Sequence, residues 1–449
     1  MTVNKNIKIT NAWICRISAQ NIVPVFGDLV ISNGRISDIA KKEFTGSFSH
    51  TRQDIDKEIN AGGRVVTVPV INFHDHFYSR LAKGLPLTGS MKNFEDILQN
   101  LWWKLDMMLD PGMIRASAQM AALESIRNGD TYIFDHHSSP NSAEGSLSII
   151  SEVLRESGLR GVLCFEATDR NGKTLSEKAI TENINSLKNS KDKDIKSMLG
   201  LHASFTLNDD TLIRASELVN EYGTGIHIHL CEDKADREES LSRFNKFPVD
   251  RLLHFNLLND KSILAHGIYL TNEDYKSIAD RGSAIVYNTD SNLNNAVGLP
   301  EFSRTAYDIP VLCGTDGMNS NAARTIKHLF LLSRYQGMTF EESFDYVKKV
   351  YFDQLNFIKK YFSDFPLLNN NDRADLIVWD YVPPTPFTKE NFWSHFIYGI
   401  LDRPIHSVIQ YGNILMKDFR ITFNDSEYQK NIVAQGKRLY NKISEINTD

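Results

Sequence analysis

Short apolar runs alternate with longer amphipathic stretches between Val68 and about Asn370. The longer stretches place apolar residues at helical spacing, as in the segment from Pro111 to Asn128. This pattern predicts eight strand–helix units, with strands at Val70–His76, Thr131–His136, Arg160–Ala167, Met198–Ser204, Gly225–Cys231, Ser262–His266, Ser283–Asn288 and Ile309–Thr315. Eight such units in succession favour an α/β fold with a (β/α)8 TIM-like barrel.

Both ends of the chain have a different pattern of apolar and polar residues. From Ile7 to Thr67 short apolar runs are cut by polar turns, and Ala374–Trp379 and Ser407–Ile414 have the same character. We therefore expect the two termini to build one small β-sandwich domain together, with the barrel inserted between them. The predicted limits are 1–67 and 371–449 for the small domain, including a terminal helix, and 68–370 for the barrel.

Composition narrows the class of partner. The 449 residues are 41% hydrophobic, enough for a large core and a smaller one. The 56 acidic and 50 basic residues are interspersed and give a net charge of −6, which argues against nucleic acid or an anionic membrane as a partner. Four scattered cysteines without a CxxC pair suggest reduced thiols. Since the sequence has neither an export signal nor an apolar membrane span, we expect a cytoplasmic protein.

Histidine and carboxylate side chains occur at the predicted strand ends. His74 and His76 are two residues apart on a strand, so both imidazoles point to the same face. Such a pair alone is weak evidence of a metal site, because strands also carry histidines for packing. However, His229, His266 and Asp316 close the fifth, sixth and eighth strands. Because such barrels collect their chemistry at these ends, we expect the groups to surround one divalent ion that keeps a position open for water.

A proton carrier follows one of these histidines. Glu232 lies three residues after His229, where its carboxylate could take a proton from the water and deliver it to a leaving group. His227 shares the strand face and could equally be the ligand, but no glutamate follows it at this spacing, so we assign it to the core. His136 and His137 could be further ligands; a role in hydrogen bonding or substrate contact is favoured.

Three other positions have two interpretations each. Trp103, like its neighbour Trp102, could belong to the core or stack on a substrate as a lid. Arg170, after the third strand, could be a surface arginine or a clamp for an anionic group. Asp75 should point away from its neighbours toward the helix layer, where a polar or capping role is expected.

Taken together, the motifs resemble those of the amidohydrolase superfamily. The resemblance rests on Asn72-x-His74-Asp75-His76, His229-x-x-Glu232, Ala265-His266-Gly267, Ser291-Asn292 and Gly314-Thr315-Asp316-Gly317. More narrowly, the chain resembles the branch that holds guanine deaminase, S-adenosylhomocysteine deaminase and the triazine chlorohydrolases. It is most similar to the SsnA-type aminohydrolases, through segments 100–106, 135–141, 200–206 and 232–236. The similarity covers nearly the whole chain.

The resemblance implies a role for each of these residues. It implies His74, His76, His229 and Asp316 around one metal, Glu232 as proton shuttle, His266 on the substrate or water, and substrate contacts for His202 and Asn292. A strand-four lysine that could bridge two metals is missing, so one ion is expected, with Zn²⁺ preferred to Fe²⁺ or Mn²⁺. The strand-seven segment Tyr287–Asn292 and Val70 before the histidine pair depart from the family pattern, which leaves the substrate open.

These observations predict a metal-dependent hydrolase that acts on carbon–nitrogen bonds other than peptide bonds. The expected reaction is hydrolytic deamination of a purine-like or other N-heterocyclic small molecule, with Asp316 and Glu232 moving protons. Hydrolysis of a cyclic amide or a carbon–halogen bond at the same site is the alternative, and a non-catalytic barrel scaffold is the rival from another class. A homodimer or higher oligomer is expected through the helix Thr325–Tyr335, which is apolar beyond a single stripe.

Overall fold

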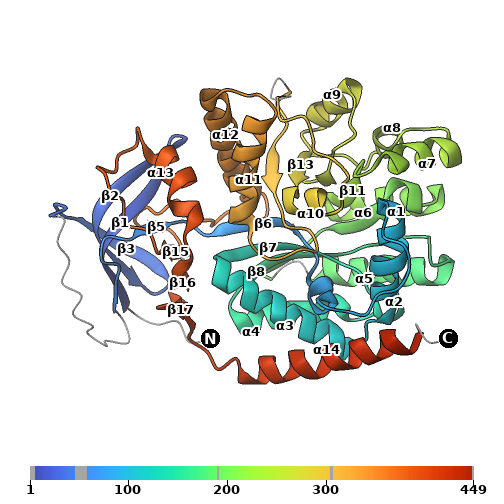
Figure 1. Cartoon of the computed structure of the whole chain (residues 1–449), viewed down its shortest axis with the longest axis horizontal. Helices are drawn as coiled ribbons and strands as arrows, with labels where there is room; N and C mark the ends of the chain where they lie inside the picture. Colours follow the sequence, from blue (N-terminus) through green and yellow to red (C-terminus); the bar gives the residue numbers. More distant parts are fainter. Residues whose placement is uncertain (1–5, 46–57, 190–191, 304–306, 447–449) are drawn as a thin grey trace.

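The structure, a computed structural model, describes residues 6–45, 58–189, 192–303 and 307–446. A sheet domain lies on the left of Figure 1 and a larger α/β domain on the right. The two ends of the chain build the sheet domain, and the middle builds the larger one. Residues 1–5 and 46–57, which belong to the predicted N-terminal part of the small domain, lie outside the described residues.

The small domain combines strands from both termini, as the sequence predicted. Its described strands are β1 (Asn6–Ser18), β2 (Asn21–Ser32), β3 (Arg35–Lys41), β4 (Glu58–Asn60), β5 (Val65–Thr67), β15 (Leu376–Trp379), β16 (Ile405–Gln410), β17 (Asn413–Lys417) and β18 (Arg420–Ile421). They follow the order β18-β17-β16-β15-β5-β1-β2-β3, with β4 beside β1. Because β5 pairs with both β1 and β15, hydrogen bonds connect the described strands from the two ends of the chain.

The larger domain contains every predicted barrel strand. These strands are β6 (Val70–Asp75), β7 (Asp130–His137), β8 (Arg160–Phe165), β9 (Ile195–Ser197), β10 (Leu199–Ala203), β11 (Ile226–Leu230), β12 (Ile263–His266), β13 (Ala284–Tyr287) and β14 (Val311–Cys313). β10 corresponds to the fourth predicted strand, Met198–Ser204, whereas β9 is a short strand just before it that the sequence pattern did not predict. All pair in parallel, in the runs β6-β7-β8-β9 and β10-β11-β12-β13-β14.

Backbone contacts join the two runs into a ring. At one seam Ala167 bridges to Leu201, and His202 N donates to Ala167 O at 2.9 Å. At the other seam Asp75 bridges to Asp316, and Asp316 N donates to His74 O at 3.0 Å. The predicted (β/α)8 arrangement is thus present, with its second seam formed by the segments that carry the candidate metal ligands.

Helices surround this ring (Figure 1). They are α3 (Pro111–Asn128), α4 (Ser146–Ser157), α5 (Lys173–Lys188), α6 (Asp209–Tyr222), α7 (Lys234–Phe244), α8 (Pro248–His254), α9 (Asn272–Arg281), α10 (Thr289–Asn294), α11 (Ala322–Tyr335) and α12 (Phe340–Ile358). Helix α3 begins where the side chain of Asp110 accepts from Met113 N, and it ends at Gly129, whose φ of 77° is left-handed. These are the limits that its sequence pattern predicted.

Shorter helical segments fill the connections. They are η1 (Phe77–Ala82), α1 (Phe94–Ile97), the π-helical turn η2 (Leu98–Trp102), α2 (Trp103–Met108), η3 (Pro140–Ser142), η4 (Ser204–Thr206), α13 (Phe392–Tyr398) and η5 (Ile400–Asp402). The segment α1-η2-α2 follows β6 and reaches the mouth of the barrel. In the described part of the chain, each helix is too short or too polar to span a lipid bilayer.

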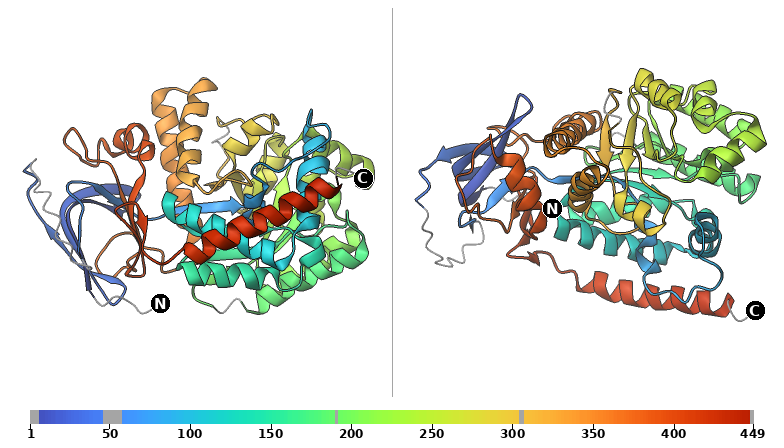
Figure 2. Two further views of the ribbon diagram at one scale, coloured as in Figure 1. Left: turned by 60° about the horizontal axis from the view of Figure 1, so that its bottom comes forward. Right: turned by 45° about the horizontal axis from the view of Figure 1, so that its top comes forward.

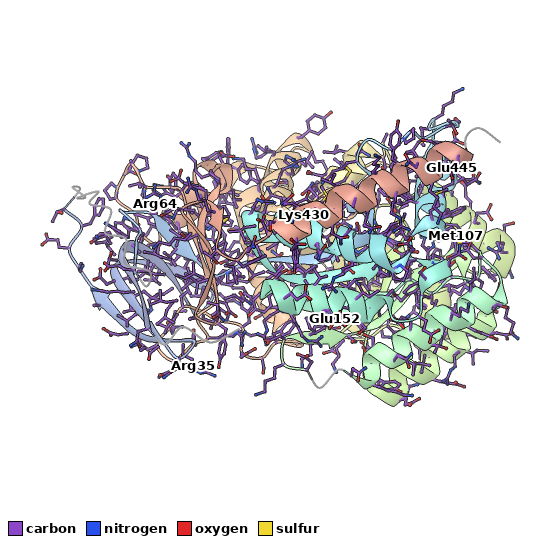
Figure 3. The ribbon with its side chains drawn as sticks, turned by 90° about the horizontal axis from the view of Figure 1, so that it is seen from below. Arg35, Arg64, Met107, Glu152, Lys430 and Glu445 are labelled. Carbon is purple, nitrogen blue, oxygen red and sulfur yellow. The ribbon has the colours of Figure 1, made fainter. Side chains whose placement is uncertain are left out.

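The terminal helix α14 (Ser426–Ile446) leaves the sheet domain and runs along the outside of the barrel, where it lies against α3 (Figure 2). Lys430 and Glu445 mark its two ends in Figure 3, whereas Arg35 and Arg64 lie in the sheet domain. Its Leu439 is buried, and Lys442 Nζ donates to Met108 O at 2.7 Å. This helix therefore ties the end of the chain to the barrel rather than to the sheet.

Candidate metal centre and active-site cavity

Imidazole and carboxylate groups from distant parts of the chain meet at the carboxyl ends of the barrel strands. His74 and His76 come from the end of β6, His229 from β11, His266 from β12, and Asp316 follows β14. His76 Nε2 lies 3.1 Å from His229 Nε2 and 2.9 Å from Asp316 Oδ1. One ligand-capable atom each of His74, His229, His266 and Asp316 lies within 4.8 Å of the others. The residues singled out in the sequence thus do converge.

Backbone carbonyls fix the protonation of two of these imidazoles. His76 Nδ1 lies 2.5 Å from His136 O, and His229 Nδ1 lies 2.9 Å from His202 O. Since a carbonyl oxygen only accepts, each Nδ1 carries the proton and each Nε2 presents a lone pair. The two Nε2 lone pairs face each other across 3.1 Å, an arrangement that requires a proton or a cation close to both. This donor set fits a divalent ion of the zinc class.

The charge balance of the protein groups agrees with this fit. Burial by itself lowers the pKa of His76, but the hydrogen bond and negative charge of Asp316 raise it overall to about 10. Burial raises the pKa of Asp316, but the hydrogen bond and charge of His76 and the charges of the nearby imidazoles lower it by more. The pKa of Asp316 therefore lies below its ordinary value. The site therefore stabilises positive charge beside Asp316, which a bound divalent ion supplies in place of a proton.

The local backbone at two strand ends is strained. His266 and Asp316 have φ angles of 75° and 55°, in the left-handed region that non-glycine residues seldom occupy. At Gly314, a Cβ atom would lie 2.4 Å from Asn288 Oδ1 and 2.8 Å from His74 Cβ. Only glycine therefore lets the eighth strand approach the histidine pair so closely. Strain of this kind is typical of functional sites, where it fixes the direction of a side chain.

Glu232 and His266 lie beside the candidate ligands. Glu232 Oε2 is 3.5 Å from His266 Nε2, and Glu232 Oε1 makes no hydrogen bond to any described residue. Burial, and next the negative charge of Asp316, raise the pKa of Glu232 well above its ordinary value. Behind the imidazole, Asn292 Nδ2 is 2.8 Å from His266 Nδ1, and Ser291 Oγ donates to Asp316 Oδ2 at 2.5 Å. This pair of carboxyl and imidazole can hold and pass a proton.

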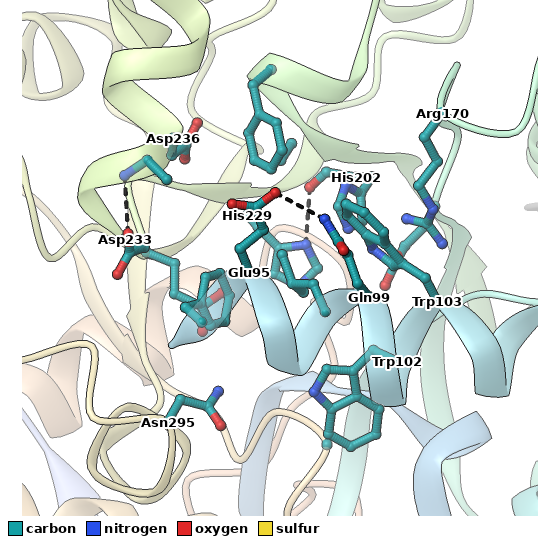
Figure 4. Close-up of a pocket in the computed structure, with 18 of the residues that line it drawn as sticks. Glu95, Gln99, Trp102, Trp103, Arg170, His202, His229, Asp233, Asp236 and Asn295 are labelled. Carbon is teal, nitrogen blue, oxygen red and sulfur yellow. Dashed lines mark hydrogen bonds between the residues drawn. The ribbon is translucent and has the colours of Figure 1, made fainter. Parts of the chain in front are cut away.

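A cavity of about 290 Å³ opens above these groups (Figure 4). Its floor includes His76, His229, Glu232 and Asp316. One side is formed by α1, η2 and α2, and another by the first turns of α7. The cavity therefore combines the candidate metal centre with enough enclosed space for a small heterocyclic ligand.

Three of the four predicted substrate contacts line one wall of this cavity. Arg170 forms an ion pair with the buried Asp106, and its guanidinium carbon lies 5.0 Å from the ring centre of Trp103. The rings of Trp103 and His202 meet edge to face at 6.4 Å, and His202 Nδ1 is 2.9 Å from Thr206 Oγ1. The fourth, Asn292, is absent from the described lining and lies behind His266 instead.

The remaining histidines lie under or beside the centre. His227 Nε2 is 2.8 Å from His74 Nδ1, and the rings of His227 and His136 stack at 4.5 Å. His137 Nε2 contacts Ser139 Oγ at 2.8 Å. None of these three histidines is among the described lining residues, so the sequence-based assignment of His227 to a lower core layer agrees with its position.

Sequence reasoning missed Glu166, which follows β8 and lines the cavity. Its side chain is 2% exposed, and Oε1 lies 3.3 Å from His76 Nδ1 and 3.4 Å from His136 Nδ1. Burial raises the pKa of Glu166 to about 7, despite the opposing effect of His76. His229 was identified by a rule that selects polar residues at the ends of predicted barrel strands. The same rule, applied to the third strand, would have identified Glu166 as well.

A parallel barrel with imidazoles and a carboxylate at its strand ends defines a class of metal-dependent hydrolases. The sequence profile of the amidohydrolase family matches residues 65–415. The chain belongs to the amidohydrolase family.

Related proteins agree with this membership. The chain is 26% identical over 426 residues to 5-methylthioadenosine/S-adenosylhomocysteine deaminase of Thermococcus onnurineus, covering 92% of this chain and 94% of that one. An adenosine deaminase from Xanthomonas campestris with bound zinc superposes with a TM-score of 0.81 at 18% identity, over 99% of both chains. A guanine deaminase from C. acetobutylicum gives 0.75 at 15% identity, over 91% and 100%. These two structures share the fold.

The family and its named relatives confirm the predicted class. The chain is a hydrolase of carbon–nitrogen bonds other than peptide bonds, with a small molecule as its substrate. The non-catalytic scaffold, the rival interpretation of the sequence, has no support from these comparisons.

Proposed function

We propose that the protein is a hydrolytic deaminase of an amino-substituted purine or related N-heterocycle, and that it uses one divalent ion, with zinc preferred to iron or manganese. The observation that carries the proposal is the pair of facing Nε2 atoms beside Asp316 and Glu232 at the floor of one cavity. The relative from Thermococcus onnurineus, named for two adenine-containing substrates, supports the purine-like class.

Four residues would hold the ion: His74, His76, His229 and Asp316. When bound, such an ion acts as a Lewis acid that makes water a competent nucleophile near neutral pH. His227, at 2.8 Å from His74 Nδ1, orients one of the four from beneath, and the carbonyl oxygen of His136 orients a second.

Glu232 is the proton carrier of the proposed reaction. Water adds to the amino-bearing ring carbon, the carbon–nitrogen bond breaks, and ammonia leaves, so that a carbonyl replaces the amine. Glu232 takes a proton from the water and delivers it to the ring nitrogen or the leaving amine, and its raised pKa favours holding that proton between the two steps. His266, whose Nε2 faces Glu232 at 3.5 Å, hydrogen bonds to the reacting oxygen. Asn292 keeps this imidazole in position.

The heterocycle itself would lie along the wall described above. Trp103 offers a ring face or edge, His202 a ring nitrogen, and Arg170 a guanidinium held in place by Asp106. These groups fix the orientation of the ring, so that its amino-bearing carbon meets Glu232.

A panel of amino-substituted purines, pyrimidines and pterins tests the proposal. Ammonia release by metal-loaded protein, abolished by a chelator and restored by zinc, is the expected result for at least one of them. Release of halide or opening of a cyclic amide, with no ammonia from any aminated ring, would replace deamination by the alternative chemistry. The carbon–nitrogen or carbon–halogen bond that breaks can be read from the product by mass spectrometry.

The assembly and the cellular location of the protein are also proposed. Helix α11 exposes Leu331 and Tyr335, and Phe340 and Tyr398 lie exposed on nearby helices. We propose that this apolar face pairs two copies of the chain. The four cysteines are free and buried, which supports a reducing compartment, the cytoplasm.

A further inference from the structure

Carboxylates greatly outnumber cations around the cavity. Among the described lining residues, Arg170 is the one Lys or Arg side chain, and its ion pair with Asp106 neutralises it. Beyond Asp316, Glu232 and the paired Asp106, five acidic side chains line the space: Glu95, Glu166, Asp233, Asp236 and Glu239. Figure 4 labels Glu95, Asp233 and Asp236 among them. Asp236 accepts from Cys231 N at 2.5 Å and is therefore turned to the backbone. The others leave a marked excess of negative charge.

One of these carboxylates points to a ligand independently of the others. Glu166 is almost fully buried, yet its Oε1 makes no hydrogen bond to a residue that the structure describes. The nearest imidazole N–H, at His76 Nδ1, is already directed to His136 O. A buried carboxylate oxygen without a donor is costly, so a donor from a bound molecule is expected there.

Two of the carboxylates that line the cavity lie at the protein surface. Glu95 on α1 and Glu239 on α7 are exposed to solvent. The cations nearest in sequence to Glu239 are engaged elsewhere: Arg237 pairs with Asp274 at 2.5 Å, and Arg243 Nη1 donates to Phe205 O. Neither basic residue lines the described cavity.

We propose that this carboxylate lining selects substrates whose part remote from the reacting ring carbon is positively charged, and that it rejects phosphate esters. The inference rests on the proposed function, because the ring must place its amino-bearing carbon beside Glu232. The remainder of the substrate then occupies the space bordered by Glu166, Glu95 and Glu239. A unit charge about 7 Å from one carboxylate in a water-like dielectric changes the affinity of the substrate by roughly threefold, so the two exposed carboxylates Glu95 and Glu239 together give about tenfold.

Three compounds with the same adenine ring test this selection: 5′-amino-5′-deoxyadenosine, which is cationic, 5′-deoxyadenosine, which is neutral, and AMP, which is anionic. We expect kcat/KM to fall in that order, by about tenfold at each step at low salt. The spread should contract when NaCl is raised from about 20 mM to about 500 mM, because added salt shortens the range of charge interactions. A merely steric effect of the 5′ group would not respond to salt.

Variants of the exposed carboxylates of the cavity distinguish charge selection from a general disturbance of the structure. The double variant Glu95→Gln/Glu239→Gln should reduce the ratio of kcat/KM between the cationic and neutral compounds by about three- to tenfold. Glu238→Gln is the matched control, because Glu238 is an exposed neighbour on α7 outside the described lining. Glu166→Gln should also reduce the ratio of kcat/KM between the cationic and neutral compounds. The metal content of this variant, measured in parallel, shows whether the substitution disturbs His76 as a metal ligand.

Equal kcat/KM for the three compounds, a preference for AMP, or an equal effect of Glu238→Gln would overturn the inference. If no compound is deaminated, dissociation constants measured by calorimetry on the zinc-loaded protein decide. Tightest binding of the cationic compound would then support the charge selection while the proposed reaction fails. Affinities that do not follow charge, or no binding of the cationic compound, would overturn the selection as well.

Discussion

Replacing Glu232 by glutamine tests whether this residue moves protons or holds the ion. The substitution keeps the size of the side chain and its hydrogen-bonding atoms but removes the exchangeable carboxyl proton. Because burial and the charge of Asp316 raise the pKa of Glu232, the neutral amide resembles the form that the free site already favours. We therefore expect the fold and the metal content of Glu232→Gln to stay close to those of the parent protein.

The expected loss lies in turnover alone. Positioned acid–base groups contribute roughly 10²–10⁴-fold, which corresponds to about 2.7–5.4 kcal/mol of barrier at 1.36 kcal/mol for each factor of ten. The only close imidazole contact of Glu232 in the described residues is the 3.5 Å approach of its Oε2 to His266 Nε2. Since a glutamine at position 232 cannot take up and release a proton, most of this factor should be lost.

The assay compares Glu232→Gln with His229→Ala. Elemental analysis gives the metal content of each variant, and single-turnover ammonia release gives the rate. His229→Ala should lose most bound metal and activity together, because it removes one ligand from a set of four. A Glu232→Gln protein that sheds its metal would make Glu232 a ligand. A fully active one would refute the reasoning and move the proton transfer to Asp316 or His266.

Four further predictions follow from the same geometry. Protein purified without added metal should carry one divalent ion per chain, and elemental analysis well below one with full activity would contradict this. Gly314→Ala should lower the melting temperature and the metal affinity, since its Cβ would lie 2.8 Å from His74 Cβ; overpacking costs about 1–3 kcal/mol in thermal unfolding. Asn292→Ala should lower kcat about tenfold with metal retained, because His266 loses the amide 2.8 Å from its Nδ1; steady-state kinetics and elemental analysis check both. Light scattering should give twice the 51.1 kDa chain mass, and Tyr335→Glu should give one chain mass.

The candidate metal ligands at the strand ends of the barrel could be predicted because their positions depend on two simple rules. Period-two placement puts His74 and His76 on one face, and the barrel rule places His229 and Asp316 at the same mouth whatever the loops do. The wall of the cavity could not be predicted in this way. Asp106 and Arg170 are 64 residues apart, and their ion pair depends on how the α1-η2-α2 segment folds back over the third strand.

The strand order of the small domain could not be predicted from the sequence either. Its short strands are clear in the sequence, but which strand lies next to which is set by pairing over long distances. β5 pairs with β1 in parallel and with β15 in antiparallel, and the second partner is more than 300 residues away along the chain. Period-two patterns specify which face of a strand is buried but not which strand lies beside it, so the order of the strands could not be predicted.

The strand β6 serves stability and chemistry on its two faces. His74 and His76 point to the candidate metal centre, and Asp75 between them points the other way, as the alternation along a strand predicts. There Asp75 pairs with Arg80 and accepts from Ser320 Oγ at 3.0 Å, with both charged side chains fully buried. Removing one partner of a buried pair costs about 3–5 kcal/mol. The outer residues of the His-Asp-His segment are therefore constrained by the ion they would hold, and the middle residue by the stability of the strand that positions them.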